Sequence, residues 1–283
     1  MPLSSPFLKV YCTSPPSALT VCGRALPGGD GLAKAADCPP KWGVATLLLV
    51  AHARFMYAKL PGTHAPLPGM QALPGPVVAL VGLAALVVVL TPTLWRLAEH
   101  VDTMAHEGAH AAVASTMGFT VGGVTMNADA TGGTDVELSN GLRMILTGFV
   151  GYLGPSAFGL CAAKLIETGR VITVLWVATI LLVLLLFLVR KSFGIVSVPV
   201  AIALLAISMR YAHEGLQEVI AYGLTWLLLL SGARTAMVHG ADAGDADFLF
   251  AITHLPRRLW ALLWIAGTIL AVIVGGKWLV LRS

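Results

Sequence analysis

The sequence predicts an all-α polytopic membrane bundle of six to seven hydrophobic segments with a small β-hairpin insertion. The first observation behind this fold class is the composition: 57% of the residues are hydrophobic and 11% are charged, whereas a soluble domain usually carries about 25% charged residues. The second is the spacing of the charges, because uncharged apolar runs that can cross or nearly cross a bilayer recur along the chain. These runs cover residues 77–94, 144–163, 171–189, 195–209 and 259–276.

Residues 1–75 differ in composition from the rest of the chain. Twelve of the 16 prolines lie within residues 1–76, and none of the long apolar runs does. Proline removes hydrogen bonds from helices and strands, so loose or disordered chain is expected here. We therefore predict a Pro-rich, disordered N-terminal extension over 1–75 and a transmembrane domain over 76–283. A translation start at Met56 or Met70 is an alternative that would leave the upstream residues without a role.

Two neighbouring segments at the start of the transmembrane domain must fold back on each other. A first span is expected over 77–95, followed by a helix over 101–117. One continuous helix over 77–117 would be about 60 Å long, roughly twice the hydrocarbon thickness of a bilayer. We therefore expect the chain to break between Arg96 and Asp102 and to return into the membrane or its inner boundary.

A β-hairpin is expected over 119–138, directly after this helix. Apolar residues nearly alternate with other residues on both sides of the Gly132-Gly133 pair, as they do in paired strands. An open hairpin cannot lie in lipid with unpaired edges, so it should sit at the surface or pack against the protein. The remaining spans are expected over 142–165, 170–190, 194–211, 214–232 and 258–281, with a polar link over 233–247.

The distribution of charge argues against nucleic-acid binding. The formal charge of +4 comes from Lys and Arg at the ends of hydrophobic segments, where membrane topology places them. Basic clusters with interleaved aromatic residues are absent from the sequence, so nucleic acid is not expected as a partner. The four cysteines show no Cys-x-x-Cys spacing, which argues against a zinc knuckle and a disulfide framework.

The helix over 101–117 carries the HExxH sequence His106-Glu107-Gly108-Ala109-His110. Positions i and i+4 of a helix lie on one face, so the two histidines can present ring nitrogens to a single metal ion. Glu107 projects beside them, where its carboxylate can take a proton from metal-activated water. Ionisable groups at membrane depth are costly and usually mark function. The alternative is an interfacial helix whose polar face meets lipid headgroups.

A hydrolytic zinc site takes three protein ligands and keeps a fourth position open, so the two histidines need a third partner from elsewhere in the chain. The sequence offers two groups of acidic candidates. Asp245 and Asp247 lie just before the last span, and Glu214 and Glu218 lie at the start of the segment over 214–232. The residues alone leave both groups open.

The order of these motifs resembles the site-2 protease family of intramembrane zinc metallopeptidases. HExxH on a membrane helix is followed by a glycine-rich hairpin and by the run Gly-Phe-Val-Gly-Tyr-Leu-Gly-Pro-Ser at 148–156. The stretch Gly-Asp-Ala-Asp-Phe-Leu at 244–249, with Thr-His-Leu-Pro at 253–256 and Trp260, resembles a compact bacterial, peptidase-like branch of that family. The resemblance covers residues 76–281 and identifies 76–283 as a transmembrane metallopeptidase-like domain.

The resemblance implies a site and an activity. His106 and His110 would be zinc ligands, Glu107 the general base, and an aspartate the third ligand, with Asp245 the first choice and Asp247 the second. The implied protein is a multi-pass endopeptidase of the bacterial cell membrane that uses Zn2+ to hydrolyse peptide bonds of membrane-protein or peptide substrates. It departs from the family in one respect: the usual Leu-Asp-Gly around the third ligand is absent from its C-terminal half.

Two other functions are open on the sequence. A proteolytically inactive membrane scaffold of the same fold would bind metal without cleaving a substrate. A small transporter would need polar residues along several spans, and the spans over 170–190 and 194–211 are almost featureless in this respect.

Two features outside the HExxH sequence have an expected role in the peptidase. We hypothesise that the hairpin binds an unwound substrate as an added strand. Gly148, Gly151 and Gly154 are spaced three apart, which is typical of close helix packing.

Overall fold

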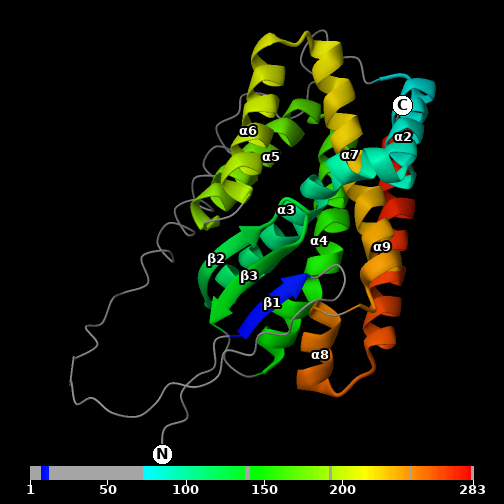
Figure 1. Ribbon diagram of the computed structural model, residues 1–283. Coiled ribbons are helices and arrows are strands. Elements are labelled where there is room, and N and C mark those ends of the chain that lie inside the picture. The colour runs from blue at the N-terminus through cyan, green and yellow to red at the C-terminus, as the bar shows by residue number, and fades with distance from the viewer. Residues whose placement is uncertain (1–7, 13–72, 138–140, 191–192, 243, 282–283) are drawn as a thin grey trace, which may run out of the picture. The chain divides into compact units, whose positions relative to one another are not determined.

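Helices make up most of the protein, whose computed structural model describes residues 8–12, 73–137, 141–190, 193–242 and 244–281 (Figure 1). Among these residues, five helices are long and apolar enough to cross a membrane, and a bent pair adds a sixth candidate span. The predicted all-α polytopic bundle with a small β-hairpin is confirmed. The helices are α2 (Gly75–Leu90), α3 (Pro92–Thr116), α4 (Leu142–Glu167), α5 (Val171–Leu188), α6 (Gly194–Tyr211), α7 (Glu214–His239), α8 (Asp245–Thr253) and α9 (Arg257–Val280).

The outward faces of the spans are apolar. Large side chains are exposed on α5, α6 and α9, among them Phe187, Leu204 and Leu262. In water, apolar patches of this extent would be costly and would promote association. Surrounded by lipid they are solvated, because the hydrocarbon core is as apolar as the side chains themselves.

Helices α2 and α3 form a broken span with a bend of 100°. Thr91, the residue between them, has an extended backbone with φ −89° and ψ 115°, which is the conformation favoured before a proline. Pro92 has no N–H group with which to continue the hydrogen bonding of α2. The predicted break between Arg96 and Asp102 is therefore wrong, since the chain turns at the proline and both charged residues lie inside α3.

Arg234 of α7 joins the two halves of this broken span. Its Nη1 donates a hydrogen bond of 2.7 Å to the carbonyl oxygen of Val89, near the end of α2, where the last carbonyls lack partners within the helix. The guanidinium carbon lies 4.6 Å from the ring centre of Trp95 on α3, within the range of a cation–π interaction. One side chain thus connects the end of α2, the start of α3 and α7.

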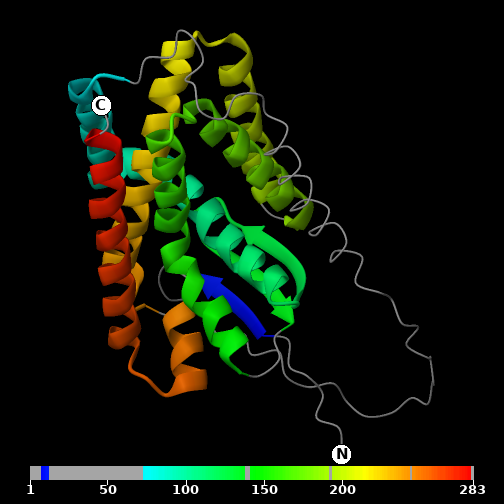
Figure 2. The same cartoon turned by 180° about the vertical axis from the view of Figure 1, so that it is seen from behind.

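The predicted hairpin forms from β2 (Thr120–Met126) and β3 (Gly132–Glu137), which pair antiparallel. A third strand, β1 (Leu8–Cys12), pairs antiparallel with the other edge of β3, so the strand order is β1-β3-β2. The sheet lies against α3 (Figures 1 and 2). β1 was not expected from the sequence. Residues 1–7 and 13–72 of the predicted N-terminal extension lie outside the described residues.

Helix α4 packs against α3, α7 and α9 (Figure 2). Glycines permit this close approach, because a Cβ at Gly154 would lie 2.5 Å from the Cβ of Ala109 on α3. At Gly159 it would lie 2.8 Å from the backbone nitrogen of Leu229 on α7. Both distances are shorter than carbon contacts in a packed interior, where atoms approach to about 3.5–4.0 Å. Helices α3 and α7 therefore depend on bare backbone along α4.

The polar link predicted over 233–247 is shorter in the structure. Helix α7 continues to His239, and α8 begins at Asp245. The short helix α8 packs against α4 and α9, and its Phe248 and Leu249 are buried with Tyr152 and Trp264. Burial of this apolar face explains why an acidic stretch that resembles a solvated link folds into a helix.

Candidate metal centre

The three ionisable side chains of the HExxH sequence on α3 face the interior of the bundle. His106, Glu107 and His110 are each exposed by no more than 3%. The two histidines lie one helical turn apart on one face, as the i, i+4 spacing requires. Asp245, exposed by 1%, enters from the first residue of α8. The fold therefore places a fourth ionisable group, more than 130 residues away in sequence, against the HExxH helix.

The donor atoms of His106, His110 and Asp245 meet at one point. Asp245 Oδ2 lies 3.1 Å from His106 Nε2 and 3.2 Å from His110 Nε2, and the two Nε2 atoms are 3.2 Å apart. A tetrahedral zinc ion with bonds of about 2.0–2.1 Å separates its ligand atoms by about 3.3–3.4 Å. The three observed separations are close to the edges of such a tetrahedron. Among the described residues, these three form the group that could hold a metal ion.

The hydrogen bonding of His110 orients its lone pair toward this point. Its Nδ1 lies 2.7 Å from the carbonyl oxygen of Thr147 on α4 and donates to it, because a carbonyl oxygen can only accept. The ring proton is then on Nδ1, and Nε2 presents a lone pair to the other two donor atoms. A backbone carbonyl that fixes the tautomer in this way is a common companion of a metal-binding histidine.

Asp245 contributes the negative charge of the cluster. Burial by itself raises the pKa of this carboxyl, but a proton on the facing imidazole nitrogens of His110 and His106, or a cation in its place, lowers the pKa below its usual value. The position at the N-terminus of α8 also favours an anion. A carboxylate and an imidazole lone pair that converge at 3.2 Å repel each other unless a proton or a cation lies between them. The residues therefore fit a divalent metal ion.

Glu107 is held by the hairpin. Thr134 of β3 donates from its Oγ1 to Glu107 Oε2 at 2.6 Å. The backbone of β3 passes close to the same side chain, since a Cβ at Gly132 would lie 2.7 Å from Glu107 Oε1. Within the described part of the chain, Oε1 is buried and has no hydrogen-bond partner. One carboxylate oxygen is thus fixed, and the other is free to accept a proton.

The other acidic candidates lie elsewhere. Asp247 forms an ion pair with Arg257 and is 38% exposed, so the second choice for the third ligand points away from the histidines. Glu214 and Glu218 lie at the start of α7 and do not join the group of metal-binding geometry among the described residues.

The sequence did not indicate which residues support the site. Thr134 and Thr147 have no motif of their own, and Thr147 acts through its backbone carbonyl, which any residue carries. Tyr152 of α4 packs edge-on against the ring of His106, with ring centres 4.9 Å apart, and its hydroxyl donates to the carbonyl of His239. Such contacts depend on how α3, α4 and β3 pack together.

The sequence also matches a known protein family. A sequence model described as Peptidase M50B-like matches residues 79–275, well over half of the chain. The protein belongs to the peptidase M50B-like family. Neither the curated proteins nor the solved structures gave a match.

Membership of the peptidase M50B-like family confirms the predicted relation to the site-2 proteases. It supports an integral membrane protein of the metallopeptidase class, in agreement with the apolar spans. The matched range contains α3, β2, β3, α4 and α8, which together supply every side chain of the cluster and its supports.

Proposed function

We propose that this member of the peptidase M50B-like family is an intramembrane zinc metallopeptidase in which His106, His110 and Asp245 bind the zinc ion. The observation that carries the proposal is the meeting of two imidazole nitrogens and one carboxylate oxygen at 3.1–3.2 Å inside the bundle. Two nitrogen ligands and one carboxylate are a donor set found in catalytic zinc sites. Zinc in such a site is a Lewis acid, which polarises a carbonyl and makes water a nucleophile at neutral pH.

Glu107 serves as the general base in this proposal. Thr134 holds Oε2, so the carboxylate cannot rotate freely and Oε1 keeps its direction. Oε1 accepts the proton of the attacking water, and the same carboxyl then delivers it to the leaving amine. Burial of Glu107 keeps bulk water from this step, which strengthens each electrostatic contact around the reacting groups.

The substrate is proposed to bind as an extended segment along β3. The outer edge of β2 is partly taken, because Arg190 donates its backbone N–H to the carbonyl of Val124 at 2.8 Å. The other edge of β3 is where β1 pairs, with Val10 opposite Thr134. A membrane-protein or peptide strand added to the sheet beside Glu107 would therefore take the place of β1. Strand addition gives affinity through main-chain hydrogen bonds, which form with any sequence of side chains.

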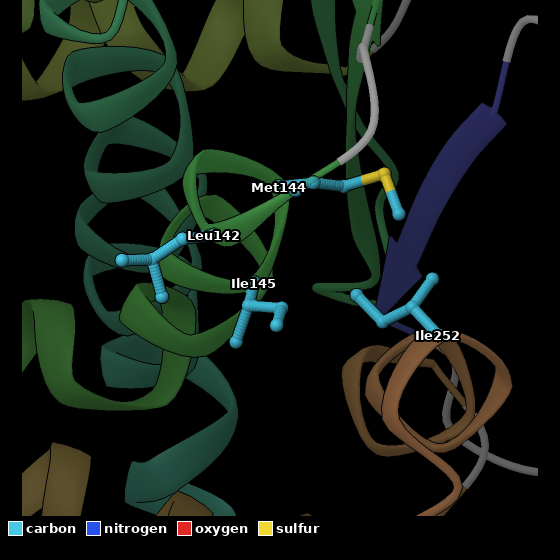
Figure 3. A pocket seen from close by; sticks show the side chains of 5 residues that line it. Leu142, Met144, Ile145 and Ile252 are labelled. Carbon is cyan, nitrogen blue, oxygen red and sulfur yellow. The ribbon is translucent and has the colours of Figure 1, made fainter.

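An apolar pocket supports binding of side chains near this edge. It has a volume of about 420 Å³ and lies between the first turn of α4 and the last turn of α8 (Figure 3). Met144 and Ile252 face each other across it, and β1 packs against α8. A strand in the position of β1 could place an apolar side chain in this pocket, as expected for a substrate that comes from a membrane.

Metal analysis of the purified full-length protein tests the zinc site. The wild type and Asp247→Ala should each hold about one zinc ion per chain, since a single ion with three protein ligands is expected. His106→Ala and Asp245→Ala should lose most of it. Asp247→Ala is the matched control, because it removes an aspartate two residues away that is paired with Arg257. Loss of zinc from Asp247→Ala together with retention of zinc by Asp245→Ala would assign the third ligand to Asp247 instead of Asp245.

Glu107→Gln separates the peptidase from a proteolytically inactive metal-binding scaffold. The variant should retain zinc and cleave about 10²- to 10⁴-fold more slowly, the usual contribution of a general base. A suitable reporter is a tagged single-span membrane protein with a Gly-Pro break in its helix, reconstituted with the enzyme in vesicles. A wild type that binds zinc and leaves such reporters intact would favour the scaffold. The bacterial cell membrane implied by the sequence resemblance stays a prediction.

A further inference from the structure

Gly151 of α4 lies directly against the three donor atoms. A Cβ built on Gly151 would be 2.3 Å from His110 Nε2, 2.5 Å from His106 Nε2 and 2.6 Å from Asp245 Oδ2. No other described glycine has all three as its nearest atoms. Carbon and nitrogen atoms that are not bonded do not approach so closely in packed interiors, where contacts are about 3.5–4.0 Å.

The three glycines of α4 that share this spacing have different neighbours. A Cβ at Gly148 would meet the ring of Phe248 at 2.4 Å, and one at Gly154 would meet Ala109 and the backbone oxygen of Ala105. These two positions fit the close helix packing predicted from the sequence. Gly151 does not, because its nearest atoms belong to the metal cluster rather than to an apolar neighbour.

The donor groups around Gly151 have little freedom to move away together. His110 is fixed by its hydrogen bond to the carbonyl of Thr147, one turn before Gly151 on the same helix. His106 is packed edge-on against Tyr152. All three nearest atoms are nevertheless the ends of side chains, so a methyl group at 151 would push them apart without displacing a backbone. The helix packing would survive, but the donor atoms would lose the separations that suit one ion.

We propose that Gly151 is a positioning residue of the metal centre, whose missing side chain keeps open the space in which the ion is bound. The inference rests on the proposed zinc site and extends it to α4, which also supplies the carbonyl of Thr147 and the ring of Tyr152. It predicts that a single methyl group on this helix abolishes metal binding although every ligand is still present.

The test compares two glycine-to-alanine variants of the full-length protein. After dialysis against a trace of free zinc, Gly151→Ala should contain at least tenfold less zinc than the wild type. Gly108→Ala is the matched control: it lies between the two histidines on α3, and a Cβ there has nothing within 4 Å. Gly108→Ala should keep the zinc content of the wild type, and both substitutions favour the helix.

Thermal unfolding provides a second readout that does not depend on activity. Added zinc should raise the unfolding temperature of the wild type and of Gly108→Ala, because a ligand that binds only the folded protein stabilises it. It should leave that of Gly151→Ala unchanged, while the metal-free proteins unfold at similar temperatures. Equal zinc content in Gly151→Ala and wild type would overturn the inference. Failure of Gly151→Ala to fold would also overturn it, by making the glycine a packing residue. A wild type that binds no zinc would instead refute the proposed function.

Discussion

Replacing Thr134 by valine removes the hydrogen bond that holds Glu107 and leaves the shape of the side chain nearly unchanged. Thr134 is fully buried on β3, and its Oγ1 donates to Glu107 Oε2 at 2.6 Å. A hydrogen bond to a charged group contributes about 1.5–3 kcal/mol, and each 1.36 kcal/mol corresponds to tenfold in rate. If this bond orients the base, Thr134→Val should slow cleavage about 10- to 150-fold.

The assay measures kcat for a single-span reporter in vesicles, together with zinc content and unfolding temperature. Zinc content should not change, because the hydroxyl of Thr134 bonds to Glu107, which is not one of the proposed zinc ligands. Thr134→Ser is the matched control, since it keeps the hydroxyl group and loses only a methyl group. Rates should be compared well below both unfolding temperatures, because valine leaves a buried carboxylate oxygen without its partner.

Two results would contradict this reasoning. A Thr134→Val enzyme that cleaves within twofold of the wild type would show that the hairpin does not position the base. A Thr134→Ser enzyme as slow as Thr134→Val would attribute the effect to packing of the methyl group instead of the hydrogen bond.

Three further predictions concern the fold, the sheet and the metal. Arg234→Ala should destabilise the protein by about 2–4 kcal/mol, because it removes a charged hydrogen bond and a cation–π contact at the broken span. Thermal unfolding in detergent measures this loss, and an unchanged midpoint would contradict it. Val10→Pro should disrupt β1 and increase hydrogen–deuterium exchange of the β3 amides, whereas Val10→Ala should leave that exchange unchanged. Equal exchange in the two variants would show that β1 does not protect β3. A chelator should lower the unfolding temperature of the wild type but not of Asp245→Ala; an equal shift in both proteins would place the bound metal elsewhere.

The sequence predicted those features that depend on neighbouring residues. The spans follow from local hydropathy, and the hairpin follows from alternation around Gly132-Gly133. The shared face of His106 and His110 follows from the geometry of a single helix. The predicted break between Arg96 and Asp102 was misplaced, because the length argument required a break without fixing its place, and the missing N–H group of Pro92 interrupts the helix earlier.

Other features depend on contacts between distant segments. β1 pairs with β3 across about 120 residues of chain, and neither strand's own sequence specifies that partner. The bond between Thr134 and Glu107 requires that the hairpin fold back on α3. Gly151 shares its three-residue spacing with Gly148 and Gly154, and its neighbours in space set it apart from them.

The sequence alone could not choose among the acidic candidates for the third ligand. The sequence by itself determined that His106, Glu107 and His110 share one helix, and it predicted that a further acid completes a metal site. Asp245 and Asp247 are alike in chemistry and two residues apart, which places them about 200° apart around a helix. Burial of Phe248 and Leu249 against α4 fixes the rotation of α8, so Asp245 faces the histidines and Asp247 faces Arg257. That rotation is a property of packing between helices, and only the tertiary structure could decide it.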